Sequence, residues 1–248
     1  MEPTTRRPPA PERGTRSLAR LFIEEWGTGS RVAVLIHGLS SCAATWSAIA
    51  PDLVRRGYRV LAPDLRGHGR SPRGAYSVAE WVDDLLESLP AEPDLAIGHS
   101  LGGVLLIEAL AGLRPARAVY EDPSWGISSD RKSLIAEFEG RKRLSAADIA
   151  RANPRWSQVV VSMRLDGFAL WDESTARDFI GDRRDYTPVG PPLQPSLVLL
   201  ADGSPFVSAG TAERLRSTGW EVRTIPQAGH HVHLDDRAAF LSTVLDWL

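Results

Sequence analysis

The chain has 248 residues, a length that suits one large α/β domain with a substantial buried core. Its formal net charge is −2 and 24% of its residues are charged, so the composition indicates neither a nucleic-acid partner nor an anionic membrane surface. No apolar run is long enough to span a bilayer, and the single cysteine, Cys42, excludes an intramolecular disulfide and suits the cytosol. We therefore expect a cytoplasmic protein with no membrane partner, either a monomer or a homodimer.

Residues 1–16 are rich in Pro and Arg, which predicts a disordered N-terminal tail. The stretch from Met1 to Gly14 also lacks the apolar core of a signal peptide, in keeping with a cytoplasmic location.

Strands and helices alternate along the first half of the chain. Arg31–Ile36 is an apolar run rich in β-branched residues, typical of a strand buried on both faces of a parallel sheet. Ser77 and Glu80 have the spacing of a capping box at the start of a helix. The alternation predicts right-handed crossovers and a mostly parallel sheet. The strands expected are 19–26, 31–36, 58–62, 95–98 and 116–121, and the helices are 43–56, 77–89 and one that follows Gly102.

The alternation stops after residue 125. Residues 126–190 contain only helical or irregular patterns, with helices expected at 131–141, 145–152 and 176–180. Strands are expected again at 196–201 and 221–225, and helices near 209–217 and at 235–248. We interpret 17–125 and 191–248 as an α/β core and 126–190 as a helical cap over the strand ends.

A candidate nucleophile lies in Gly98-His-Ser-Leu-Gly102, which follows an apolar run and precedes a good helix former. This G-x-S-x-G pattern is typical of a sharp strand-to-helix turn with the serine at its tip. The serine would then lie at a helix N-terminus, where free N–H groups favour a developing negative charge. We therefore predict that Ser100 is a nucleophile.

Several motifs in the same order resemble those of the α/β-hydrolase superfamily, and the resemblance extends over nearly the whole chain from about Ala19. The motifs are Val34-Leu-Ile-His-Gly-Leu39, Ala62-Pro-Asp-Leu-Arg-Gly-His-Gly-Arg-Ser71, Gly98-His-Ser-Leu-Gly-Gly103 and Gly229-His-His-Val-His233. The resemblance implies an α/β-hydrolase fold, with a mostly parallel sheet flanked by helices and a helical cap insertion. It also implies an oxyanion hole formed by the backbone N–H groups of Leu39 and Leu101.

The resemblance assigns the general base to His230, the first histidine of the Gly-His-x-x-His loop. We expect His233 to point inward, His231 to be exposed and His99 to be a packing residue. A metal site is the rival interpretation of the three clustered histidines. It is disfavoured because the sequence lacks the His-x-x-x-His helix spacing and an obvious carboxylate ligand.

The triad acid departs from the common family pattern. Most members place an aspartate just after the strand that follows the cap, but here Ser204 occupies that position and Asp202 falls two residues early. Glu121 and Asp122 instead end the strand after the serine turn, as does the acid of haloalkane dehalogenases and zearalenone lactonases. We predict Glu121 as the acid, with Asp202 second and Asp122 third.

These residues predict a serine hydrolase that cleaves a small-molecule carboxylic ester or lactone through an acyl-enzyme. Because the nucleophile is a serine, the aspartyl-ester chemistry of dehalogenases and epoxide hydrolases is disfavoured. No cofactor is implied, since the Gly67-His-Gly69 segment lacks the G-x-G-x-x-G fingerprint. An apolar pocket is predicted from residues of the cap and its border: Trp125, Trp156, Met163 and Trp171.

Two alternatives to the esterase hypothesis stay open. One keeps the triad but hydrolyses a carbon–carbon bond, with Arg155 or Arg164 binding a carboxylate, or carries out cofactor-free perhydrolysis. The other is a non-catalytic ligand sensor on the same fold, which the serine and histidine make less favoured.

Overall fold

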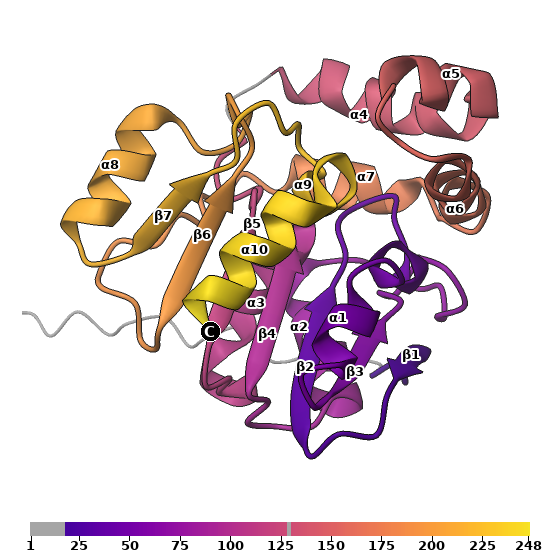
Figure 1. Ribbon diagram of the computed structural model, residues 1–248. Coiled ribbons are helices and arrows are strands. Elements are labelled where there is room, and N and C mark those ends of the chain that lie inside the picture. Colours follow the sequence, from indigo (N-terminus) through magenta and orange to yellow (C-terminus); the bar gives the residue numbers. More distant parts are fainter. Residues whose placement is uncertain (1–17, 128–129) are drawn as a thin grey trace, which may run out of the picture.

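The computed structural model describes residues 18–127 and 130–248 (Figure 1), so the tail predicted for residues 1–16 lies outside the described residues. Its centre is a seven-stranded sheet in the order β1-β3-β2-β4-β5-β6-β7. β1 pairs antiparallel with β3, and the other neighbours pair in parallel, which confirms the predicted mostly parallel sheet. The strands are β1 (Ile23–Trp26), β2 (Arg31–Ile36), β3 (Tyr58–Pro63), β4 (Leu95–His99), β5 (Ala118–Glu121), β6 (Ser196–Leu200) and β7 (Glu221–Thr224).

Helices cover both faces of this sheet because successive strand residues point to opposite sides. Val34 and Ile36 belong to one apolar cluster, whereas Ala33 and Leu35 belong to the other. The first cluster includes side chains of α2 (Val78–Ser88), α3 (Leu101–Leu113) and α8 (Ala209–Ser217). The second includes side chains of η1 (Ala43–Trp46), α1 (Ala50–Val54), α9 (Val232–Asp235) and α10 (Arg237–Trp247).

In the described chain between β5 and β6, helices occur from Arg131 to Gly181, within the stretch where the sequence predicted helical or irregular structure. Figure 1 shows these helices gathered beyond the carboxyl ends of the strands. Within the described ranges, no helix combines the length and the apolarity needed to cross a membrane. The inserted helices are α4 (Arg131–Gly140), η2 (Arg141–Arg143), α5 (Ala146–Ala152), α6 (Gln158–Ala169) and α7 (Ser174–Gly181).

Two local differences from the sequence prediction have physical causes. The helix expected over 43–56 is divided into η1 and α1, and α1 begins again with Pro51 in its first turn, where the missing N–H has no intrahelical role. The helix α6 was not anticipated, because Val159, Val160 and Val161 are β-branched and weaken the helical signal. Ser157 nevertheless caps it, since the Ser157 hydroxyl accepts a hydrogen bond from the Val160 N–H.

Candidate active site

Ser100 lies in the turn between β4 and α3, where the sequence predicted it. Its backbone has φ 54° and ψ −115°, a conformation that is strained for a residue with a side chain. Two glycines allow the close packing that holds this turn. A Cβ atom on Gly98 would lie 2.3 Å from the carbonyl oxygen of Gly102, and one on Gly102 would lie 2.2 Å from that of Ile36.

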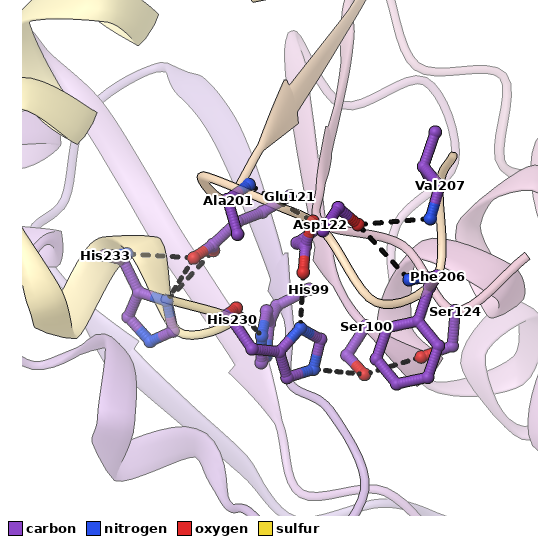
Figure 2. Close-up of polar contacts among 11 residues, drawn as sticks. His99, Ser100, Glu121, Asp122, Ser124, Ala201, Phe206, Val207, His230 and His233 are labelled. Carbon is purple, nitrogen blue, oxygen red and sulfur yellow. Dashed lines mark hydrogen bonds and ion pairs between the residues drawn. The ribbon is translucent and has the colours of Figure 1, made fainter. Parts of the chain in front are cut away.

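Ser100 is the first member of a chain of hydrogen bonds with His230 and Asp122. The Ser100 hydroxyl lies 3.0 Å from Nε2 of His230, and Nδ1 of His230 lies 2.6 Å from Oδ2 of Asp122 (Figure 2). Asp122 is fully buried, and its Oδ1 accepts a hydrogen bond from the Ala201 N–H at 3.1 Å. The geometry is that of a serine–histidine–aspartate triad.

The structure corrects the position predicted for Glu121. Its carboxylate contacts Nδ1 of His233 at 2.8 and 2.9 Å and accepts the backbone N–H of His233 at 2.8 Å. Glu121 continues the alternation of β5, so its side chain enters the core layer where His233 packs against Trp46 and Phe240. Asp122 follows the strand with φ 37°, which an aspartate tolerates better than most residues, and turns toward His230.

Asp202, the second choice for the acid, is also not placed against His230. Its Oδ2 accepts the N–H of Gln227 at 2.9 Å in an exposed turn. Ser204, which occupies the usual position of the acid, has a local role. Its hydroxyl accepts the N–H groups of Phe206 at 3.3 Å and of Val207 at 3.1 Å.

Phe206 is a neighbour of the site that the sequence analysis missed. Its ring meets the imidazole of His230 edge to face, with 4.9 Å between the ring centroids. Figure 2 shows it beside His230 and Ser124. The Ser204 turn therefore places an apolar ring against the imidazole instead of a carboxylate.

The other histidines pack around His230. His99 is 3% exposed, its Nε2–H donates to the carbonyl of His230 at 2.9 Å, and burial lowers its pKa well below the usual range. His233 is buried as expected and stacks on Trp46 at 4.3 Å. His231 was expected to be exposed, but it is half-buried between His99 and Trp156, and burial lowers its pKa as well.

The loop after β2 lies directly against the serine turn. A Cβ atom on Gly38 would lie 2.9 Å from Nδ1 of His99 and 3.0 Å from Cβ of Ser100, so only glycine permits this approach. Leu39 follows and is 5% exposed, while Leu101 is the first residue of α3, where an N–H has no intrahelical acceptor. Both candidate oxyanion donors therefore come from segments that contact the serine.

Two buried histidines hold this loop. Nδ1–H of His37 donates to the Gly38 carbonyl at 2.7 Å, and its Nε2 accepts the Leu65 N–H at 3.0 Å. His68 accepts the Ser40 N–H through Nε2 at 3.2 Å. Burial lowers the pKa of both rings, so they accept these hydrogen bonds in the neutral form at neutral pH.

Ser124 is a second neighbour that the sequence analysis did not identify. Its hydroxyl lies 2.8 Å from the hydroxyl of Ser100, and its N–H donates to the Ser100 carbonyl at 3.2 Å. It follows Asp122 by two residues in the turn after β5. Its place beside a carboxylate-bearing turn was the only signal, and serine is too common in turns for that signal to be specific.

The four predicted pocket residues divide into two pairs. Trp125 is 1% exposed and packs on Tyr120, and its indole N–H donates to the Gly103 carbonyl at 3.3 Å, so it is a core residue. Trp171 is likewise buried, and its N–H donates to Thr175 at 2.6 Å.

The second pair, Trp156 and Met163, contacts other segments of the core. Trp156 is half-buried, donates its N–H to Asp235 at 2.6 Å and meets His231 edge to face. Met163 accepts a hydrogen bond from the Ser47 hydroxyl at 3.3 Å, which ties α6 to the segment after η1. Trp156 and Met163 therefore stay candidates for the pocket, whereas Trp125 and Trp171 pack within the core.

Comparison with known proteins gives a family match and several relatives. The model of the Alpha/beta hydrolase family matches residues 33–243. An uncharacterized protein of Mycobacterium tuberculosis is 44% identical over 197 residues, which cover 77% of this chain and 53% of that protein. The chain thus spans about half the length of this relative. An sn-1-specific diacylglycerol lipase of Mus musculus is 28% identical over 249 residues, covering 87% of this chain and 80% of the lipase.

Solved structures show the same fold. A bromoperoxidase from Bacillus anthracis has a TM-score of 0.76 and 22% identity, covering 92% of this chain and 95% of that chain. An esterase from Exiguobacterium antarcticum has a TM-score of 0.75 and 15% identity, with coverage of 92% and 95%. The family match, together with the parallel sheet and the serine turn between β4 and α3, shows that the chain belongs to the alpha/beta hydrolase family.

Proposed function

We propose that the protein is a serine hydrolase that cleaves a small-molecule carboxylic ester through an acyl-enzyme on Ser100. The family match supports a hydrolase. The observation that carries the proposal is the hydrogen-bonded chain from Ser100 through His230 to Asp122, at 3.0 and 2.6 Å. A nucleophile within hydrogen-bond distance of a base, which is itself oriented by a third group, is the geometric signature of nucleophilic catalysis.

In this mechanism His230 is the general base. Nε2 of His230 removes the proton as the Ser100 hydroxyl attacks the ester carbonyl, and then returns it to the leaving alcohol. Water, activated by the same imidazole, releases the acid and restores the serine. The N–H groups of Leu39 and Leu101 stabilise the oxyanion, and one such donor contributes about 3 kcal/mol to lowering the barrier.

Asp122 takes the role first assigned to Glu121. Its Oδ2 accepts a hydrogen bond from Nδ1–H of His230, which leaves Nε2 free to act as the base. The carboxylate also stabilises the imidazolium that forms during attack. Asp122 is itself held by the N–H of Ala201, so its orientation is preset by the end of β6.

The complete chain of hydrogen bonds argues against the ligand-sensor alternative. We further propose that the helices within residues 126–190 form a cap over the site, because Trp156 joins them to the histidine loop and Met163 joins them to the segment after η1.

The experiment that tests this function measures hydrolysis of 4-nitrophenyl acetate and butyrate. We expect wild type to show a burst followed by steady turnover, and Ser100→Ala to lose both. Ser242→Ala, an exposed serine on α10, is the matched control and should keep full activity. Stoichiometric labelling of wild type but not Ser100→Ala by a fluorophosphonate supports the acyl-enzyme. Turnover that survives in Ser100→Ala overturns the proposal that the acyl-enzyme forms on Ser100.

A further inference from the structure

Arg164 is a buried cation that the proposed mechanism does not use. It lies on α6 and is 2% exposed, and its guanidinium rests over the ring of Phe168 at 4.8 Å. Within residues 18–127 and 130–248, neither Nε nor Nη1 has a hydrogen-bond partner. Buried guanidinium donors that lack an acceptor are costly, and structures rarely keep them without a use.

The surroundings of Arg164 increase this cost. Burial and, to a smaller extent, the charge of Arg141 together lower its pKa to about 9, so Arg164 is still a cation at neutral pH. Arg141 donates from Nη2 to Glu137 at 3.2 Å, but the Glu137 side chain is 64% exposed and screened by solvent. The environment of the two guanidinium groups is therefore positive.

Both arginines adjoin the loop that carries the candidate oxyanion donor. Nη1 of Arg141 donates to the hydroxyl of Ser40 at 2.9 Å. Gly167 lies on the same face of α6 as Arg164, and a Cβ atom there would be 3.6 Å from Sγ of Cys42 and 3.9 Å from the Ser40 carbonyl.

The same loop links this positive region to the nucleophile. Its other end, at Gly38, contacts Ser100, and the three Cα–Cα steps from Gly38 to Ser41 span at most about 11 Å. The charge of Arg164 also depresses the pKa of His99 and His231, which border the imidazole of His230. Arg164 and the proposed nucleophile are therefore associated with opposite ends of one short loop.

We propose that Arg164, with Arg141 beside it, binds a carboxylate of the substrate, so that the ester cleaved at Ser100 is an anionic one. A carboxylate fits because it offers several lone pairs to guanidinium donors and compensates a buried charge. Arg155 is a useful contrast, since it is exposed and donates to the Gln227 carbonyl. This inference rests on the proposed function, and it names the substrate class of that site.

The test compares matched anionic and neutral esters. The acyl-side pair is 4-nitrophenyl hydrogen adipate against 4-nitrophenyl hexanoate, and the alcohol-side pair is 3-acetoxybenzoate against its methyl ester. We expect wild type to favour the anionic member of at least one pair by tenfold or more in kcat/KM. Arg164→Met should reduce that ratio at least tenfold, mainly through KM, and Arg164→Lys should restore part of it. The control Arg155→Met should keep the ratio within twofold.

A binding measurement separates this inference from the proposed function. Calorimetric titration of Ser100→Ala with adipate should show binding that weakens at least tenfold when Arg164→Met is added. Arg164-dependent binding without turnover of any ester supports the anion site and overturns the esterase. Ser100-dependent turnover with no anionic preference and no adipate binding keeps the esterase and overturns the anion site. Thermal unfolding of each variant shows that the fold is intact.

Discussion

Glu121 and Asp122 are neighbours in the chain, yet their carboxylates bind different histidines. Asp122 accepts from His230 at 2.6 Å, while Glu121 accepts from His233 at 2.8 Å. Both contacts join the end of β5 to the histidine segment, His230 just before α9 and His233 within it. One carboxylate orients the proposed base, and the other fixes the segment that carries it.

This division of roles predicts different results for two isosteric substitutions. Asp122→Asn removes the acceptor for the proton on Nδ1 of His230 and favours the wrong tautomer, so we expect kcat for 4-nitrophenyl acetate to fall on the order of 10⁴-fold. Glu121→Gln should leave kcat within about tenfold and instead lower the free energy of unfolding by about 1–3 kcal/mol. Steady-state kinetics at matched protein concentration measure the change in kcat, and urea denaturation measures the change in the free energy of unfolding.

Asp202→Asn is the control for this pair, since Asp202 contacts only an exposed turn. It should behave like wild type in both measurements. A large loss of kcat in Glu121→Gln, with Asp122→Asn active, would contradict the role proposed for Asp122.

The sequence led to Ser100 and His230 but ranked their partner Asp122 only third among the candidate acids, for a reason of local geometry. The G-x-S-x-G motif and the histidine loop are recognised from the spacing of their residues along the sequence, which can be read directly. The choice between Glu121 and Asp122 depends on which residue is the last to follow the alternation of β5. That boundary is set by the φ of 37° at Asp122, and no residue pattern encodes this angle strongly.

Ser124→Ala tests the hydroxyl next to the nucleophile. The Ser124 hydroxyl lies 2.8 Å from that of Ser100, and as a donor it would stabilise negative charge on the attacking oxygen. A hydrogen bond of this kind contributes about 0.5–1.5 kcal/mol, so kcat should fall by about 2- to 13-fold. A steady-state assay with 4-nitrophenyl butyrate measures it. A loss as large as that of Ser100→Ala would instead give Ser124 an essential role.

Gly102→Ala tests the packing of the serine turn. The added methyl group would lie 2.2 Å from the Ile36 carbonyl, so the backbone must shift, and we expect the free energy of unfolding to fall by about 3 kcal/mol or more. Gly210→Ala on α8 is the matched control, because its methyl group meets nothing closer than 3.9 Å. It should stabilise the protein by about 0.5–1 kcal/mol. Urea denaturation measures the free energy of unfolding of both variants. Equal changes in Gly102→Ala and Gly210→Ala would contradict the steric argument.

Stability should decrease in mild acid. His37, His68 and His99 are buried, and burial lowers the pKa of each below the value of about 6.5 expected in the unfolded chain. Below about pH 6.5 the unfolded chain therefore binds more protons than the folded protein. Each ring then contributes up to about 1.4 kcal/mol of lost stability per pH unit.

Urea denaturation at pH 7.5, 6.5 and 5.5 checks this dependence. The slope should become shallower in His68→Gln, because one buried ring no longer titrates, whatever the overall stability of that variant. Equal stability of wild type at pH 7.5 and 5.5 would contradict the prediction.

The core of the fold was more predictable from the sequence than the inserted segment. Buried parallel strands such as Arg31–Ile36 are continuous apolar runs, and the expected bounds agree with β2. α6 was missed because its valines favour extended structure in isolation and adopt a helix only when packed. The unpaired guanidinium of Arg164 depends on that packing, so the sequence could not separate it from the exposed Arg155.

The pairing of β5 with β6 has a consequence for how this family member could diversify. Because the two strands are parallel, the segment between them leaves the core after Glu121, at the carboxyl edge of the sheet, and re-enters at Ser196, which lies beside Ala118 at the opposite edge. Both of its ends are fixed by the pairing of β5 with β6, whatever the insertion contains. Residues such as Arg164 can therefore be exchanged, or the whole insertion replaced, while the strand register that places Asp122 is unchanged. The proposed ligand preference and the proposed catalytic residues can therefore change independently of each other during evolution.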